Sequence, residues 1–262
     1  MLQIAVASRS ETGQRDRNED KVVVARHGDW WLAVVADGAG GHRGGAEASR
    51  RAVHELVDAL HDAGVRFGAP NLSHAVLAAH ARLRWGQVDQ QGTERMHTTV
   101  VALWLDSVAG KAVWSHVGDS RLYRVHHGHL ELMTADDSVV QRMVEAGLIT
   151  PEQAQTHPQK NQLIAALGVD DDIDAHTPVE PMSVVEGDAY LLCTDGWWGS
   201  LDEAAIVGTL VEAAGPEDWL AAMQHRIEER AAPRQDNFSA AALWVGDVCE
   251  VTRPMGPDLP TP

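Results

Sequence analysis

The chain has 262 residues, of which 44% are hydrophobic and 23% charged, and its formal net charge at pH 7 is −17. These values are typical of a globular chain with one large domain. They argue against nucleic acid or an anionic membrane as a partner, because contacts with phosphate groups need clustered Lys and Arg.

The chain also lacks the sequence features of a membrane or secreted protein. No stretch approaches the roughly 20 consecutive apolar residues that span a bilayer, and residues 1–10 lack the pattern of a signal peptide. The two cysteines, Cys193 and Cys249, show no metal-ligand spacing. We therefore expect a cytoplasmic monomer with reduced thiols, although one disulfide is an open alternative.

Short apolar runs typical of strands occur at both ends and in the middle of the chain, with two long helical patterns between them. This order differs from the strand–helix alternation of a doubly wound parallel sheet. It suits an α+β sandwich of antiparallel sheets flanked by helices. In chain order we predict strands at 4–7 and 30–36, helices at 46–63 and 72–85, strands at 98–105, 112–117 and 122–125, a helix at 136–147, and strands at 190–193 and 240–245.

Three segments are predicted to be irregular. Residues 16–20 form a densely charged loop after the first strand, and residues 150–168 are rich in turn residues. Prolines recur through the last ten residues and preclude regular structure there. We predict one domain over residues 1–250 and a Pro-rich, disordered tail over residues 251–262.

Aspartates lie at the ends of several predicted strands. Asp37, Asp119 and Asp195 each follow an apolar run, and Asp236 precedes the last one. Because a buried strand holds its terminal residue rigidly, several strands of one sheet can aim carboxylates at one point. Converging carboxylates repel one another in a low dielectric and are tolerated when a cation lies between them. Oxygen ligands with almost no His or Cys nearby favour Mg²⁺ or Mn²⁺ over zinc or copper.

Each of these aspartates has a plainer interpretation, because Asp-Gly after a strand is also a common turn signal. The glycines after Asp37 and Asp195 are expected to let the backbone turn sharply and to bring a carbonyl oxygen within ligand distance. Four such positions together, one of them followed closely by an arginine, favour the cation site.

Five segments, taken in order, resemble the motifs of the PP2C (PPM) phosphatases, most closely those of compact bacterial members. Each motif is weak alone, and the five in this order and spacing are highly specific. The resemblance implies a four-layer α-β-β-α sandwich, with the metal site at one end. The segments are residues 13–20 (GQRDRNED), 37–41 (DGAGG), 118–121 (GDSR), 195–196 (DG) and 236–237 (DN).

The same resemblance implies a set of site residues. It implies two Mn²⁺ or Mg²⁺ ions in a core site bridged by Asp37, and a third, more weakly bound ion at Asp119. The implied metal ligands are Glu19, Asp37, the Gly38 carbonyl, Asp119, Asp195 and Asp236, with Asp20 and Asn237 supporting them from behind and Arg15 binding the substrate phosphate.

The chemistry follows from these parts. A water shared by two divalent cations has its pKa lowered towards neutrality, so hydroxide is available near pH 7. It attacks phosphorus in line, while the cations and Arg15 offset charge on the non-bridging oxygens. Arginine suits this role because its planar fork binds two phosphate oxygens at once. The resemblance thus implies a serine/threonine phosphatase that acts on phosphoproteins and opposes a bacterial Ser/Thr kinase.

Some positions depart from the family pattern. Ala39 stands where some eukaryotic relatives carry a histidine that protonates the leaving group, and His42 is our candidate substitute, with an ordinary surface histidine as the alternative. His97, Asp137 and Ala165 replace the usual glycine, histidine and arginine near the flap of relatives. These changes bear on substrate preference, and none removes an implied metal ligand.

Two tryptophans next to an implied ligand have two interpretations. Trp197 and Trp198 follow Asp195-Gly196, and we interpret them as packing residues, with a place at the rim of the site as the alternative. Cys193 lies within an apolar strand, so we expect an inert buried thiol.

Three other functions compete with the phosphatase interpretation. A phosphoprotein-binding regulator could keep the fold without turnover, but the intact set of Asp37, Asp195 and Asp236 argues against it. A regulatory phosphatase of stress-sigma-factor switches would usually lack the Gly-Asp-Ser-Arg segment and carry a sensor domain. A metal-dependent hydrolase of another fold would use several histidine ligands.

Overall fold

The structure is a computed structural model, and it describes residues 1–39, 44–87, 96–230 and 235–248. His42, Cys249 and the predicted tail at 251–262 lie outside these ranges. Within the described ranges, no helix is both long enough and apolar enough to cross a membrane.

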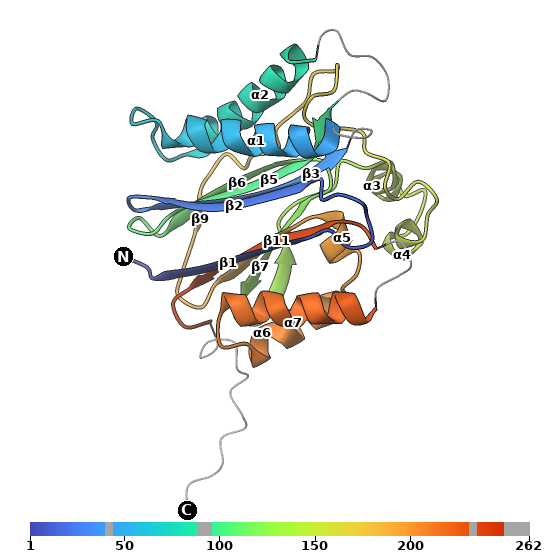
Figure 1. Cartoon of the computed structure of the whole chain (residues 1–262). Coiled ribbons are helices and arrows are strands. Elements are labelled where there is room, and N and C mark those ends of the chain that lie inside the picture. The colour runs from blue at the N-terminus through green and yellow to red at the C-terminus, as the bar shows by residue number, and fades with distance from the viewer. Residues whose placement is uncertain (40–43, 88–95, 231–234, 249–262) are drawn as a thin grey trace, which may run out of the picture.

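Two antiparallel sheets form the centre of the molecule (Figure 1). The first has the strand order β1-β11-β10-β7-β8, and the second has the order β2-β3-β5-β6-β9 with β4 paired to β3. The first sheet consists of β1 (Ile4–Glu11), β7 (Arg121–His126), β8 (His129–Leu132), β10 (Ala189–Cys193) and β11 (Phe238–Val245). The second consists of β2 (Asp20–His27), β3 (Trp30–Ala39), β4 (His97–Thr98), β5 (Val100–Asp106), β6 (Lys111–Val117) and β9 (Met182–Ser183).

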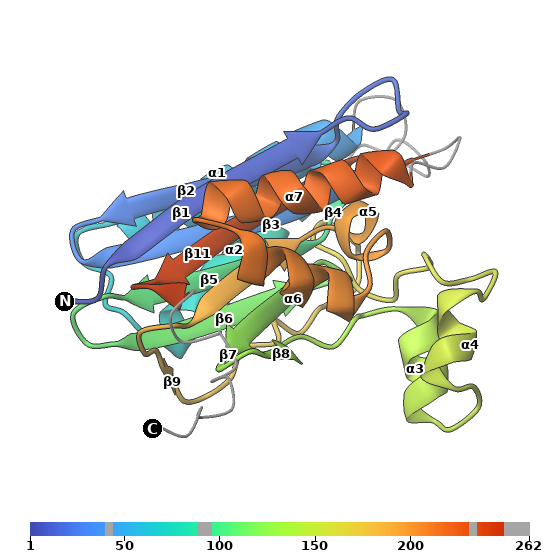
Figure 2. The ribbon, with the colours of Figure 1, turned by 90° about the horizontal axis from the view of Figure 1, so that it is seen from below.

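Helices cover the outer faces of both sheets. α1 (Gly44–His61) and α2 (Ala69–Trp85) pack on the second sheet, while α6 (Glu203–Glu212) and α7 (Pro216–Glu229) pack on the first (Figure 1). This arrangement confirms the predicted four-layer α-β-β-α sandwich. Three short helices, α3 (Val139–Glu145), α4 (Pro151–Gln155) and α5 (Asp195–Trp198), lie at one end, where α3 and α4 project from the sandwich (Figure 2).

Three hydrophobic clusters hold these layers together, one under each helix layer and one between the sheets. The central strands contribute to two clusters at once, because successive side chains of a strand point to opposite faces. In β3, Ala33 and Val35 pack between the sheets, while Leu32 and Val34 pack under the helices. Both faces of β3 are therefore buried, which explains why its sequence is continuously apolar.

The structure differs from the predicted elements in several places. β2, α6 and α7 are absent from the predictions, and the helix predicted at 136–147 is the shorter α3. α3 starts late because the Ser138 side chain accepts a hydrogen bond from the backbone N–H of Gln141 and caps the helix. Asp136 and Asp137 therefore lie before the helix, where their carboxylates make tertiary contacts.

Candidate metal centre

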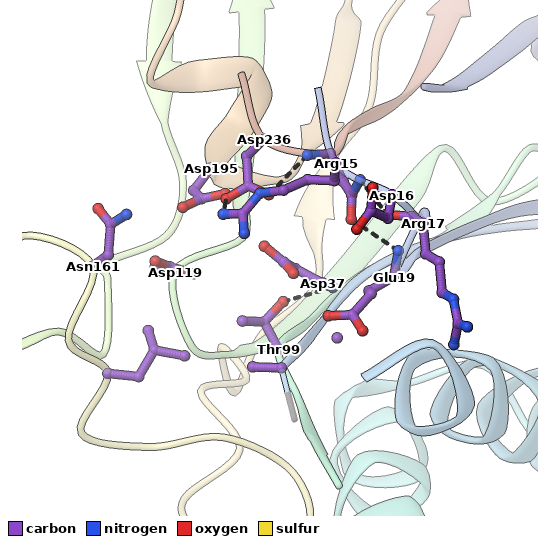
Figure 3. Close-up of a pocket in the computed structure, with 14 residues that line it drawn as sticks. Arg15, Asp16, Arg17, Glu19, Asp37, Thr99, Asp119, Asn161, Asp195 and Asp236 are labelled. Atoms are coloured by element: carbon purple, nitrogen blue, oxygen red, sulfur yellow. Dashed lines mark hydrogen bonds and ion pairs between the residues drawn. The ribbon is translucent and has the colours of Figure 1, made fainter. Parts of the chain in front are cut away.

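A cavity of about 630 Å³ lies where the ends of the two sheets meet (Figure 3). Its lining is strongly polar and carries more carboxylates than any other type of side chain. The lining residues are Arg15, Asp16, Arg17, Glu19, Asp37, Gly38, Ala39, Thr99, Asp119, Asn161, Leu163, Asp195, Asp236 and Asn237.

The carboxylates of this cavity come from both sheets. Asp37 lies within β3, Asp119 lies in the turn from β6 to β7, Asp195 opens α5 two residues after the end of β10, and Asp236 precedes β11. Our expectation that strands of one sheet would aim them at one point is therefore wrong. The sheets pack face to face, so their ends meet at the same end of the sandwich, and neither sheet alone contains the set.

Two threonines fix the backbone of Asp37. The Asp37 N–H donates to Thr99 Oγ1 over 3.0 Å, and the Asp37 carbonyl accepts from Thr98 Oγ1 and from the Thr99 N–H, each over 2.8 Å. The Thr99 hydroxyl also lies 2.7 Å from the Ser120 hydroxyl. Thr99 therefore links Asp37 to the turn that carries Asp119.

Gly38 and Gly196 have a different role from the one predicted. Neither adopts a positive φ, and both continue the element that contains them, so the predicted sharp turns are wrong. A Cβ on Gly38 would lie 2.1 Å from the Gly45 carbonyl oxygen, and one on Gly196 would lie 2.0 Å from that of Asn237. Glycine is needed at both positions because another backbone segment lies in close contact with each of them. The contact at Gly196 brings α5 to the start of β11.

Two oxygen atoms converge beside the first turn of α1. The point that a Cβ on Gly45 would occupy lies 2.6 Å from the Gly38 carbonyl oxygen and 2.7 Å from Glu19 Oε2. A side chain at position 45 would fill the space between these oxygens. The structure thus places the Glu19 carboxylate beside the Gly38 carbonyl.

Asn237, which also lines the cavity, and Asp20 hold segments that carry candidate ligands. Asn237 Oδ1 accepts from the Glu19 N–H over 2.9 Å, and Asn237 Nδ2 donates to the carbonyls of Thr12 and Arg17, each over 2.8 Å. Asp20 Oδ2 accepts from the hydroxyl of Thr194 over 3.0 Å. Asn237 thus holds the loop that carries Arg15, and Asp20 holds Thr194, the residue before α5.

Arg15 reaches over the cavity from this loop. One of its Nη atoms lies 2.6 Å from Asp236 Oδ2, and its side chain is 57% exposed (Figure 3). The guanidinium therefore lies beside a candidate ligand while most of it faces solvent.

Burial and mutual repulsion raise the pKa values of several carboxylates around the cavity. Burial, followed by repulsion from neighbouring carboxylates, raises the pKa of Asp20 to about 7 and that of Asp119 to about 8. The same causes raise the pKa of Asp37 well above its ordinary value and raise the pKa values of Asp195 and Glu19. Asp37 and Asp195 keep some solvent access through the cavity, yet surrounding protein removes most of their hydration. A cation among these groups would favour their charged forms.

The donor set fits a hard, partly hydrated cation. Asp20 Oδ1 and Asp195 Oδ1 are buried and have no hydrogen-bond partner within the described ranges. In the described part of the chain, no group of three or more Asp, Glu, His or Cys side chains is arranged to hold a metal ion. Mg²⁺ and Mn²⁺ suit such an open site, because Mg²⁺ commonly keeps several waters and binds through one or two carboxylates.

Some cavity residues escaped the sequence analysis. Asn161 and Leu163 line the cavity from the segment interpreted only as a loop, where no pattern marks them. Trp197 is fully buried in the core, as predicted, and burial raises the pKa of the neighbouring Cys193 thiol, which fits the expected inert residue. Trp198 contacts the site, because its Nε1 donates to the Asp119 carbonyl over 2.9 Å.

Comparison with known proteins agrees with this geometry. The family model described as protein phosphatase 2C matches residues 8–241. The chain belongs to the protein phosphatase 2C family. Serine/threonine protein phosphatase PstP of Mycobacterium tuberculosis is 34% identical over 237 residues, which are 88% of this chain and 42% of PstP. Serine/threonine phosphatase stp of Listeria innocua is 33% identical over 204 residues, which are 76% of this chain and 79% of stp. This protein phosphatase 2C chain thus spans less than half the length of the mycobacterial relative.

Solved structures match over almost the whole chain. The crystal structure of Mycobacterium tuberculosis PstP/Ppp has a TM-score of 0.82 and 27% identity, and the match covers 94% of this chain and 100% of that one. The catalytic domain of PstP in complex with two manganese ions has a TM-score of 0.81 and 27% identity, with the same coverage. Stp1 of Staphylococcus aureus has a TM-score of 0.82 and 26% identity, covering 94% of this chain and 96% of that one.

Proposed function

We propose that this chain is a metal-dependent phosphatase that hydrolyses phosphoserine and phosphothreonine in proteins. The observation that carries the proposal is the cavity in which carboxylates from both sheets face one another beside Arg15. Membership of the protein phosphatase 2C family and similarity to named serine/threonine phosphatases support it.

The candidate ligands divide into two groups. Glu19, Asp37, the Gly38 carbonyl, Asp195 and Asp236 would hold two Mn²⁺ or Mg²⁺ ions, and Asp119 would hold a third, weaker one. The manganese complex of the similar PstP domain supports a two-ion core. When bound, such ions lower the pKa of coordinated water and offset negative charge on phosphate oxygens.

The residues of the chain contribute orientation and substrate binding. The contacts of Asp37 with Thr98 and Thr99 fix the backbone that carries its carboxylate, so the group is positioned before the reaction starts. Arg15 can turn its exposed guanidinium from Asp236 to the phosphate, where its fork would bind two oxygens.

A direct test measures phosphate release from phosphoserine and phosphothreonine peptides with Mn²⁺ and with a chelator. We expect turnover with Mn²⁺ only, and we expect Asp195→Asn to abolish it while Asp58→Asn, an exposed change on α1, does not. Phosphopeptide binding without turnover by the wild-type chain would instead identify a binding regulator.

His42 is our proposed proton donor to the leaving serine oxygen, and it lies outside the described residues. His42→Ala should lower turnover of a phosphoserine peptide and hardly affect an aryl phosphate, whose leaving group needs no acid. An equal loss on both substrates would rule out this role.

We further propose that the chain acts as a cytoplasmic monomer on the targets of a Ser/Thr kinase. The names of the related serine/threonine phosphatases support phosphoprotein substrates. A phosphoproteome comparison between cells with the wild-type chain and cells with Asp37→Asn tests the cellular role, and light scattering tests the oligomeric state. Unchanged phosphosites would contradict the former, and a dimer mass would contradict the latter.

A further inference from the structure

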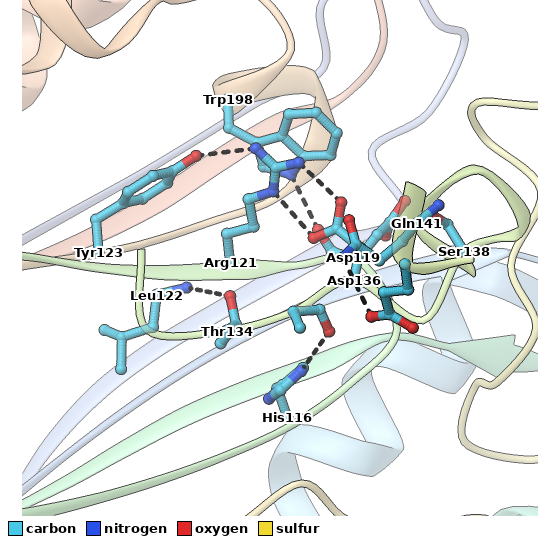
Figure 4. Close-up of polar contacts among 12 residues, drawn as sticks. His116, Asp119, Arg121, Leu122, Tyr123, Thr134, Asp136, Ser138, Gln141 and Trp198 are labelled. Atoms are coloured by element: carbon cyan, nitrogen blue, oxygen red, sulfur yellow. Dashed lines mark hydrogen bonds and ion pairs between the residues drawn. The ribbon is translucent and has the colours of Figure 1, made fainter. Parts of the chain in front are cut away.

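One hydrogen bond connects two candidate ligands that come from different sheets. α5 has four residues, begins at Asp195 and ends at Trp198. The Trp198 indole N–H donates to the backbone carbonyl of Asp119 over 2.9 Å (Figure 4). Since one helical turn fixes Trp198 relative to Asp195, this bond ties the Asp119 backbone to the start of α5.

The indole ring is itself held in place by Arg121. The Arg121 guanidinium lies 3.5 Å from the centroid of the Trp198 ring, an arrangement that combines stacking with a cation–π contact (Figure 4). Two bonds to Asp136, of 2.9 and 2.8 Å, and one of 3.1 Å to the Tyr123 hydroxyl orient the guanidinium. The side chains of Arg121 and Asp136 are only 22% and 9% exposed, so solvent competes little with these contacts.

Different contacts hold the two residues beside Asp119. The Gly118 N–H donates to Asp137 Oδ2 over 3.0 Å, and the Ser120 hydroxyl pairs with Thr99. Neither contact reaches the peptide group that follows Asp119, whose orientation depends on the soft dihedral angles on either side of it. Among the residues that the structure describes, the Trp198 N–H is the group that holds this carbonyl.

We propose that Trp198 is a positioning residue that sets the place of Asp119 relative to Asp195. This inference rests on the proposed function. Trp198 would then set the affinity of the cation site at Asp119. Residues that orient a metal ligand typically change metal affinity by roughly 10- to 100-fold when they are replaced.

The adjacent Trp197 provides a matched control. It lies in the same helix, is fully buried and packs against Phe238, and its Nε1 has no hydrogen-bond partner within the described ranges. Trp197→Phe removes buried volume without removing a hydrogen bond to the site. Trp198→Phe removes the bond to Asp119 and leaves an aromatic ring for Arg121.

The experiment measures Mn²⁺ binding to the whole chain by electron paramagnetic resonance of free Mn²⁺, well below the melting temperature of each variant. We expect Trp198→Phe to weaken the weakest binding step about tenfold and to leave the tighter steps unchanged. Asp119→Asn should remove that weakest step, while Trp197→Phe should bind as wild type with a lower Tm. With phosphopeptide, Trp198→Phe should need more Mn²⁺ for half-maximal rate and regain kcat near the wild-type value at saturation.

Three results would overturn the proposal: wild-type binding by Trp198→Phe, equal weakening by Trp197→Phe, or an unchanged weakest step in Asp119→Asn. Each of them leaves the proposed phosphatase activity intact. That activity fails separately, if the wild-type chain releases no phosphate from phosphopeptides with Mn²⁺.

Discussion

The layer between the two sheets has a middle and an end of opposite character. In the middle, side chains such as Val35, Leu103 and Leu243 form a fully buried aliphatic cluster. At the end, the same layer opens into the carboxylate cavity. β3 contributes to both the cluster and the cavity, because Ala33, Val35 and Asp37 follow one another along the same face of the strand.

This contrast shows how the fold supports an unfavourable site. Crowding carboxylates away from water costs free energy, whereas burying aliphatic side chains between sheets stabilises the fold by about 25 cal/mol per Å² of apolar surface. The middle of the layer therefore offsets the cost of its end. Changes at the carboxylate end should therefore affect activity more than stability, and changes in the aliphatic middle should affect stability more than activity.

The largest effect is expected from Asp37→Asn. We expect Mn²⁺-dependent phosphate release to fall on the order of 10³-fold, because a carboxylate that would hold the ions is lost. The Tm of the metal-free variant at pH 8 should equal or exceed that of wild type, since burial disfavours the Asp37 charge. Asp58→Asn, on the surface of α1, is the control for both measurements. A large drop in Tm for Asp37→Asn would contradict the separation of the two regions.

The converse change is Leu103→Ala in the middle of the layer. Leu103 is fully buried, so its truncation should lower the free energy of unfolding by roughly 2–5 kcal/mol. Urea unfolding measures this loss, and kcat per folded molecule should stay near wild type. Leu77→Ala, at a position 38% exposed on α2, should cost much less. Loss of kcat in folded Leu103→Ala would show that the middle of the layer also shapes the site.

The carboxylate end should make the metal-free protein less stable as pH rises from 6.5 to 8. The folded-state pKa values of Asp20 and Asp119 are raised to about 7 and about 8, whereas an unfolded Asp titrates near 4. The folded state therefore binds more protons than the unfolded state in this window, and the stability present at low pH is lost as pH rises through the folded pKa values.

Each such group changes the free energy of unfolding by at most about 1.4 kcal/mol per pH unit. Buried histidines such as His116, whose pKa is lowered by burial, act in the opposite sense mainly below this window. Thermal unfolding with and without Mn²⁺ measures the effect. Mn²⁺ should remove the decline, and Asp20→Asn should reduce it. A Tm that rises with pH in the metal-free wild type would refute the prediction.

The smallest effect is expected at the rim of the cavity, from Arg15→Lys. Lysine keeps the charge but loses the planar fork, so KM for a phosphopeptide should rise roughly tenfold with little change in kcat. Steady-state kinetics at saturating Mn²⁺ provide the measurement. Arg50→Lys, which alters an exposed ion pair with Glu47 on α1, should leave both constants unchanged. A fall in kcat alone would assign Arg15 to a step after binding.

Several elements could have been predicted and were not. β2 carries Val22, Val23 and Val24, a β-branched run that favours a strand, but the charged residues beside it suggested a loop. α7 buries Trp219, Leu220, Met223 and Ile227 at helical spacing. By contrast, no local pattern marks Asn161 as a cavity residue, because its place depends on how a loop returns to the sandwich.

The sequence by itself indicated the layered architecture and a hard-cation site, and its resemblance to the protein phosphatase 2C family supplied the candidate ligands. Apolar runs ending in Asp37 and Asp195 indicated buried strands and a hard-cation site, because hydrophobic periodicity and ligand chemistry are local properties. Tertiary structure alone decided that these carboxylates come from facing sheets, that Gly38 and Gly196 serve close approach, and that Trp198 bonds to the Asp119 backbone. These features depend on how two sheets pack face to face, and the distances between segments remote in sequence are set by that packing.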